Sequence, residues 1–205
     1  RSLPPGVVMK RAAGLVMRRI TAATERRRDT KKPSYCRETP PGPLHVICDA
    51  LPISRLAAQR HRIEPLAAHH AAHRFNLLGA GWAVWRLIDP GYRPIDWQID
   101  FKSGYRWHED CWSADIPFGI ENGVDVKVPW ELSRMQHLVT LAFADALVRA
   151  ETGAAETVFQ RAFRNHVLDF IATNPPRFGV NWRCTMDVAI RAANWAMAYG
   201  LFRAG

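Results

Sequence analysis

Residues 174–195 hold the side chains whose types and spacing most clearly suggest a chemistry. A Pro-Pro pair and a glycine turn come first, and a helical pattern carrying Asp187, Arg191, Asn194 and Trp195 follows. Side chains three or four residues apart share one face of a helix, so amide, guanidinium and indole groups occupy neighbouring turns. These groups can pair with a carboxylate, donate to hydroxyls and stack against a ring. The segment therefore indicates binding of sugar rings that bear carboxylates.

Arg177, Asn181 and Trp182 lie in the turn before this helix and extend the same candidate site. Backbone N–H groups at a helix N-terminus favour anions, so an acidic ligand suits this position. The alternative is a plain surface ion pair between Asp187 and Arg191, which contributes well under about 1 kcal/mol.

A second cluster spans residues 127–137 and begins with Lys127. Trp130 and Arg134 are four residues apart, and Glu131 and Arg134 are three apart, so these side chains share one helix face. A ring beside a fixed guanidinium can stack on a pyranose while the guanidinium pairs with its carboxylate. Two alternatives involve no ligand: a Glu–Arg pair that orients the helix start, or a buried network of Glu131, Arg134 and Arg191. For these three residues the structural alternatives are favoured.

Three histidines, His69, His70 and His73, form a third cluster. His69 and His73 are one helical turn apart and could share a metal ion, with Glu64 or His61 nearby. The sequence has no H-E-x-x-H pattern and no clear third ligand, so we expect histidines on a helix surface and no metal site.

Several chemistries have no supporting motif in this chain. The four cysteines form no C-x-x-C pair and match no zinc spacing. The sequence contains no phosphate-binding glycine loop, no dinucleotide fingerprint and no G-x-S-x-G elbow. We therefore expect neither nucleotide chemistry nor a cofactor.

The positive charge is concentrated near the beginning of the chain. Residues 1–60 hold 13 Lys and Arg against 4 Asp and Glu, and residues 61–205 hold 15 of each, so the net charge of +9 belongs to the first segment. Such a segment could bind nucleic acid, lipid headgroups or acidic polysaccharide. A solvated helix face is the favoured alternative. The sequence contains no run of 18 apolar residues, so it predicts no membrane span.

Apolar periodicity predicts helices over most of the chain. A length of 205 residues with 48% hydrophobic content suits one sizeable core. We expect a basic, proline-interrupted segment over residues 1–60, irregular over 29–47, and a helical domain over 61–205. Short turns between the later helices favour an all-α fold of stacked helical hairpins. The predicted helices are 6–28, 53–73 with an interruption near Pro65, a stretch from Pro129 to about 149, 155–172 and 185–202.

Five of the eight tryptophans lie between residues 82 and 124: Trp82, Trp85, Trp97, Trp107 and Trp112. Alternation at 82–85 and 95–99 is compatible with short strands, but loops are favoured. Long polar loops with aromatic residues often carry binding sites. The alternative is a segment fixed by its own buried aromatic rings.

In order along the chain, these motifs resemble the heparinase II/III-like family of polysaccharide lyases, over about residues 73–199. The matching stretches are His73-Arg-Phe-Asn-Leu-Leu-Gly79, Asp96-Trp97 with Asp100, Trp107, Asp125-Val-Lys127, Trp130-Glu-Leu-Ser-Arg134-Met-Gln-His137, Asn174-Pro-Pro-Arg-Phe-Gly-Val-Asn-Trp182, Met186-Asp-Val-Ala-Ile-Arg191 and Asn194-Trp195.

The resemblance implies an incomplete (α/α) toroid, whose following β-sandwich is absent from this chain. It implies β-elimination at a uronic acid in a secreted or periplasmic enzyme. An asparagine neutralises the C5 carboxylate there, while tyrosine and histidine carry protons. Nothing after Trp195 matches these groups, so no catalytic residue is carried over, and we expect them downstream of Gly205.

The leading hypothesis is thus the N-terminal part of a lyase for acidic glycans, whether heparan-like, alginate-like or an exopolysaccharide. A helical domain that binds acidic polysaccharide without cleaving it is the alternative. A protein that uses the basic segment on nucleic acid or membrane surfaces comes third. The candidate substrate-binding residues are Lys127, Trp130, Arg134, Arg177, Asn181, Trp182, Arg191 and Asn194.

Overall fold

The computed structural model describes residues 5–29, 53–79, 81–84, 93–117, 119–120 and 123–204. By their contacts, residues 1–39 and residues 40–205 form two compact units. Most of the predicted irregular segment 29–47 lies outside the described residues, as do Trp85 and Gly205. The domain boundary expected after residue 60 stays a prediction.

The described residues of the first unit form one long helix, α1 (Pro5–Asp29), which confirms the helix predicted over 6–28. Proline suits the first helical position because its missing N–H would have no partner there. Arg26, Arg27 and Arg28 lie in the last turn, where positive charge complements the helix dipole.

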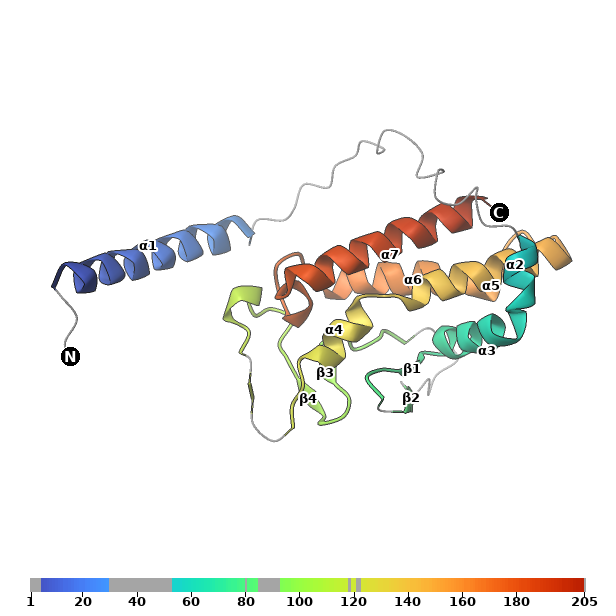
Figure 1. Ribbon diagram of the computed structural model, residues 1–205, viewed down its shortest axis with the longest axis horizontal. Coiled ribbons are helices and arrows are strands. Elements are labelled where there is room, and N and C mark those ends of the chain that lie inside the picture. Colours follow the sequence, from blue (N-terminus) through green and yellow to red (C-terminus); the bar gives the residue numbers. More distant parts are fainter. Residues whose placement is uncertain are drawn as a thin grey trace. The chain divides into compact units, whose positions relative to one another are not determined.

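The described residues of the second unit are mostly helical, with two small antiparallel sheets (Figure 1). The prediction of an all-α fold is therefore correct only as a mostly helical fold. The helices are α2 (Ile53–Ala58), α3 (Arg60–Ala71), α4 (Lys127–Ser133), α5 (His137–Thr152), α6 (Val158–Thr173) and α7 (Thr185–Ala204). The short 3-10 segments are η2 (Ser113–Asp115) and η3 (Val180–Trp182), and the strand pairs are β1 (Arg74–Asn76) with β2 (Trp82–Val84), and β3 (Ile99–Asp100) with β4 (Tyr105–Arg106).

Helix α5 is the centre of this unit, and α3, α6 and α7 all pack against it. Its own apolar face supplies Leu138, Leu141, Ala142 and Ala144 to the main core. Because three helices surround α5, seven of its 16 residues are buried.

The turn between α5 and α6 is fixed at both helix ends. Gly153 ends α5 in the left-handed conformation, at φ 65°, which suits a residue without Cβ. Thr157 caps α6, because its Oγ1 accepts hydrogen bonds from the backbone N–H groups of Phe159 and Gln160. The same hydroxyl donates to Asp145 Oδ1 at 2.6 Å, so the cap is also tied to α5.

The predicted interruption near Pro65 is wrong, because α3 continues through that residue and the break lies at Gln59. Proline removes only one backbone donor, and this helix packs on α5 and α6 with Ala67 fully buried. Gln59 instead accepts from the N–H groups of Arg62 and Ile63 and so begins the new helix.

The prediction that residues 82–84 form a loop and not a strand is also wrong, since this segment forms β2 and pairs with β1. Its partner strand was not recognised in the sequence. Further along, Trp97, Trp107 and Trp112 are buried, as expected if aromatic rings fix the segment. Trp97 Nε1 donates to Asp169 Oδ2 at 3.2 Å, which joins this segment to α6.

Candidate functional site

The site begins at a sharp corner between α4 and α5. One helix was predicted from Pro129 to about 149, but α4 ends at Ser133 and α5 starts at His137. Between them, Met135 has φ 56°, a left-handed backbone that a residue with a side chain rarely adopts. The chain thus turns at this residue at a conformational cost of order 1–3 kcal/mol.

Three side chains of α7 hold that corner in place. Arg191 Nη1 donates to the Ser133 carbonyl oxygen at 3.2 Å, and Asn194 Nδ2 donates to the next carbonyl oxygen, that of Arg134, at 2.8 Å. Trp195 Nε1 lies 2.8 Å from Met135 Sδ. These contacts satisfy carbonyls that the end of α4 leaves without helical partners, and they explain how the strained turn is maintained.

Arg191 is buried, with 3% of its surface exposed. Its Nη2 donates to the Asn181 carbonyl oxygen at 3.1 Å, and its guanidinium lies over the rings of Phe170 at 4.5 Å and Trp182 at 5.0 Å. Burial lowers the pKa of Arg191 to about 10, against the opposing effect of the Asp187 charge. The side chain therefore stays charged near neutral pH and links α7, η3 and the corner.

Arg134 lies in the same network. Its Nε donates to Asp187 Oδ1 at 2.6 Å, and its Nη1 donates to Glu131. Burial disfavours the charged form, but the hydrogen bond to Asp187 and the charge of Glu131 outweigh it and raise the pKa of Arg134. Glu131, Arg134 and Arg191 thus meet in the interhelical network that the sequence offered as an alternative to ligand binding.

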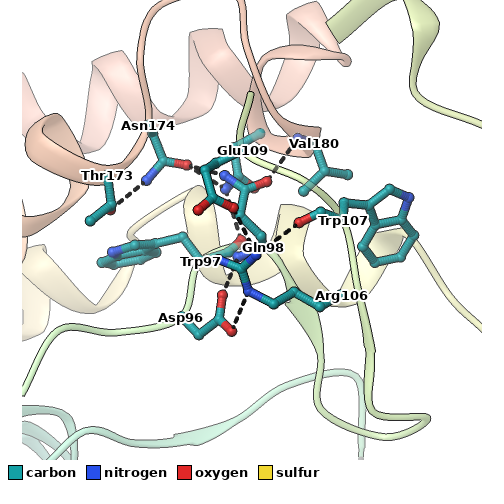
Figure 2. Close-up of polar contacts among 10 residues, drawn as sticks. Asp96, Trp97, Gln98, Arg106, Trp107, Glu109, Thr173, Asn174 and Val180 are labelled. Carbon is teal, nitrogen blue, oxygen red and sulfur yellow. Dashed lines mark hydrogen bonds and ion pairs between the residues drawn. The ribbon is translucent and has the colours of Figure 1, made fainter. Parts of the chain in front are cut away.

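A second set of polar side chains, which we call the amide network, consists of Gln98, Asn174 and Asn181 (Figure 2 draws Gln98 and Asn174). Asn174 Oδ1 accepts from Gln98 Nε2 at 2.8 Å and from Asn181 Nδ2 at 2.9 Å. Asn181 Nδ2 also donates to the Trp97 carbonyl at 2.8 Å, and Gln98 Oε1 accepts from Val180 N at 2.9 Å. All three side chains are buried, so the network fixes η3 against the loop before β3.

Gly179 lets these two segments approach each other. Its φ is 76°, and an added Cβ would lie 2.7 Å from Gln98 Nε2 and 2.8 Å from Gln98 Oε1. Any side chain here would displace the buried amide of Gln98. Sequence reasoning placed Gly179 in a turn but did not find Gln98, because nothing local marks its partners.

The eight predicted site residues divide by exposure. Asn181 and Arg191 are buried, and Trp130, Arg134, Trp182 and Asn194 are partly buried. Lys127 has a side chain that is 70% exposed, 3.9 Å from Asp125 Oδ1. Arg177 is also exposed and has φ 69°.

Trp130 connects the exposed and the buried parts of this region. Its Nε1 donates to the Val180 carbonyl at 2.9 Å, so α4, which begins with Lys127, is attached to η3. The main-chain carbonyl of Arg177 accepts from Ser113 N at 2.9 Å, which fixes the loop before η3. Lys127 and Arg177 therefore project from segments that are themselves held in place.

An open depression of about 420 Å³ lies beside the amide network. Arg106 stands at its edge and pairs with Asp96 at 2.9 Å and with Glu109 at 2.7 Å (Figure 2). Its hydrogen bond to Glu109 raises the pKa of Arg106 and lowers that of Glu109. Trp97 and Gln98 also line this depression, which the sequence did not predict.

Four histidines, His70, His73, His137 and His166, gather where α3, α5 and α6 meet; we call them the histidine cluster. His166 Nδ1 lies 3.2 Å from His137 Nε2. The expectation of surface histidines is wrong for His73, which is buried and has φ 54° just after α3 ends. Sequence spacing missed the pairing because His137 and His166 come from other helices.

Burial lowers the pKa of each member of the histidine cluster. The pKa of His70 and that of His73 fall to about 4, that of His166 falls to about 3, and that of His137 falls well below its ordinary value. The four rings are therefore neutral near pH 7. Among the described residues, no three His, Cys, Asp or Glu side chains are arranged to hold a metal ion.

Comparisons with protein families, with curated proteins and with solved structures find no match to this chain. Within the part of the chain that the structure describes, no helix is both long and apolar enough to cross a membrane.

Proposed function

We propose that this chain is the N-terminal helical part of a polysaccharide lyase that cleaves uronic-acid-containing glycans by β-elimination. The resemblance of its ordered motifs to the heparinase II/III-like family is the basis of this proposal. The observation that carries it is spatial: motifs spread over about a hundred residues meet in one connected set of buried and partly buried contacts. Gln98, Arg134, Asn174, Asn181 and Arg191 all belong to that set.

The finer part of the fold proposal is an (α/α) toroid, to which further helices would be added beside α7. Met186 and Met197 are 57% and 39% exposed, and Ala189 and Ala193 between them are exposed as well. These four positions follow the spacing of one helix face. A continuous exposed apolar stripe favours packing by another element, which supports the toroid.

The acidic substrate follows from the chemistry of elimination. The C5 proton of a uronic acid becomes removable when the charge of its carboxylate is offset. In this proposal Lys127, in the first turn of α4, and Arg177, in the loop before η3, attract the acidic chain, and the partly buried Trp130 contacts sugar rings. Arg134, Asn181, Trp182, Arg191 and Asn194 shape the surface by holding the corner and η3. The proposal also places the catalytic groups downstream of Gly205 and the enzyme in the periplasm or outside the cell.

Binding titrations test the site. The 205-residue chain should bind a uronic-acid polysaccharide and not a neutral glucan of equal length. Lys127→Gln and Arg177→Gln should each weaken binding about two- to fivefold, the effect of one exposed charge pair. Arg164→Gln removes an exposed charge from the middle of α6 and should change nothing.

Equal binding of the acidic and the neutral polymer would contradict the substrate class. If all three variants weakened polysaccharide binding equally, the binding surface assigned to Lys127 and Arg177 would be contradicted. General attraction by the net charge would then explain the binding. Specific binding without elimination by the complete protein would instead support the alternative, a domain that binds acidic polysaccharide without cleaving it.

A further inference from the structure

Helix α1 exposes a row of apolar side chains. Val16, Met17 and Ile20 are 55%, 62% and 53% exposed, and Ala13 and Ala23 are exposed on the same side. Residues three and four apart follow one face of a helix, so these five positions form a stripe over about three turns. We call them the α1 stripe.

Arginines border the α1 stripe on both sides. Each residue advances about 100° around the axis of an α-helix, which places Arg19 and Arg28 about 100° and 80° from Ile20, in opposite directions. Both arginines are exposed. By the same count the acidic residues Glu25 and Asp29 lie about 140° and 180° from Ile20, on the far side of the helix.

We propose that α1 lies in the surface of an anionic lipid bilayer, with the α1 stripe in the acyl boundary and its arginines among the phosphates. Such an interfacial helix combines an apolar face with flanking cations whose stems reach up to the headgroups. Nucleic acid and acidic polysaccharide could pair with the arginines but offer the α1 stripe no apolar environment. The stripe therefore favours lipid.

The proposal is independent of the proposed lyase activity, since α1 belongs to residues 1–39 and the glycan surface to residues 40–205. Each arginine near an anionic surface contributes about a fivefold increase in binding. Withdrawing two side chains as apolar as Val16 and Ile20 from the acyl boundary should cost at least about tenfold.

Vesicle sedimentation of the full 205-residue chain tests this inference. Vesicles of phosphatidylcholine with phosphatidylglycerol should bind the chain, and phosphatidylcholine vesicles should bind it far less. The double variant Val16→Gln with Ile20→Gln should weaken binding at least about tenfold at unchanged net charge. The double variant Arg19→Gln with Arg28→Gln should weaken it about fivefold for each arginine. Glu25→Gln, on the opposite side, is the matched control and should cause no loss.

Circular dichroism of each variant should show unchanged helix content, so that a loss of binding reports the surface and not the fold. Double-stranded DNA added in place of vesicles separates the two sources of anionic charge. Vesicle binding that is insensitive to Val16→Gln with Ile20→Gln, or equal binding to neutral vesicles, would overturn the proposal. Loss of DNA binding but not of vesicle binding in the arginine variant would also overturn it.

Discussion

Replacing Gly179 with alanine tests whether the amide network excludes a side chain at that position, and Gly153, which also has positive φ but open space around it, supplies the comparison. Both glycines have positive φ, but Gly153 lies in the left-handed helical region at ψ 17°, whereas Gly179, with φ 76° and ψ 174°, lies in a region that almost only glycine adopts. An alanine in the left-handed helical region of Gly153 costs roughly 1–2 kcal/mol, and one in the region of Gly179 costs about 1–3 kcal/mol. In both cases about 0.4–1 kcal/mol is offset by the stiffer unfolded chain. A Cβ on Gly153 would meet nothing within 4 Å, whereas one on Gly179 would collide with the Gln98 amide at 2.7 Å. Gly153→Ala should therefore cost only about 1 kcal/mol.

The additional cost at Gly179 follows from the amide network. Displacing Gln98 breaks its hydrogen bonds to Asn174 Oδ1 and to Val180 N, both buried. Each buried group left without a partner costs about 1–3 kcal/mol. Together with the backbone strain, Gly179→Ala should therefore lower the free energy of unfolding by at least about 3 kcal/mol.

Urea unfolding followed by circular dichroism measures both variants. In a Gln98→Ala background the collision is absent, so adding Gly179→Ala should cost only its backbone strain, about 1–3 kcal/mol. Equal destabilisation by the two glycine variants in the natural background would refute the role given to Gln98. An undiminished effect of Gly179→Ala in the Gln98→Ala background would refute it as well.

Three further changes follow from the buried contacts. Each member of the histidine cluster has a pKa in the folded protein below the unfolded value of 6.5. The free energy of unfolding should therefore be level above pH 6.5 and fall as the pH drops toward 4, by up to about 1.4 kcal/mol per pH unit for each ring. Urea unfolding at a series of pH values should show a shallower fall for His166→Asn, and an unchanged slope would contradict this. Arg191→Lys loses the two hydrogen bonds to backbone carbonyls and the stacking on the aromatic rings, so it should lower the free energy of unfolding by about 2–3 kcal/mol. Arg203→Lys, exposed on the same helix, should leave that free energy unchanged. Equal losses in urea unfolding would show that the burial of Arg191 is unimportant. Thr157→Ala removes the cap of α6 and a hydrogen bond to α5, so it should lower the midpoint of thermal unfolding. Thr157→Ser keeps the hydroxyl and should preserve that midpoint. An equal drop of the midpoint in both variants would mean that the methyl group, not the hydroxyl, matters.

The sequence predicted the helices well where the signal is local. Apolar spacing, the Pro-Pro pair and the glycine turns place α1, α6 and α7 within a few residues of their observed bounds. The corner at Met135 was missed because the contacts that stabilise it come from α7, about sixty residues further on. A helical pattern across residues 129–149 carries no trace of that distant support.

The sequence predicted which residues belong to the candidate site better than it predicted how their side chains are arranged. Spacing brought Arg134 and Arg191 to attention, but it could not say whether a guanidinium faces solvent or backbone carbonyls. Gln98 was missed because its partners, Asn174 and Val180, lie 76 and 82 residues away. Only the tertiary fold brings such groups together, so single-sequence reasoning had no signal for them.

The most direct test of the proposed lyase is the product of the reaction. The complete protein, expressed from the uninterrupted reading frame that contains residues 1–205, should be incubated with each uronic-acid polysaccharide that the chain binds. β-Elimination leaves a double bond conjugated with the carboxylate, so the account predicts a rise in ultraviolet absorbance with every chain cut. A reading frame that ends at Gly205, or binding without any unsaturated product, would contradict it.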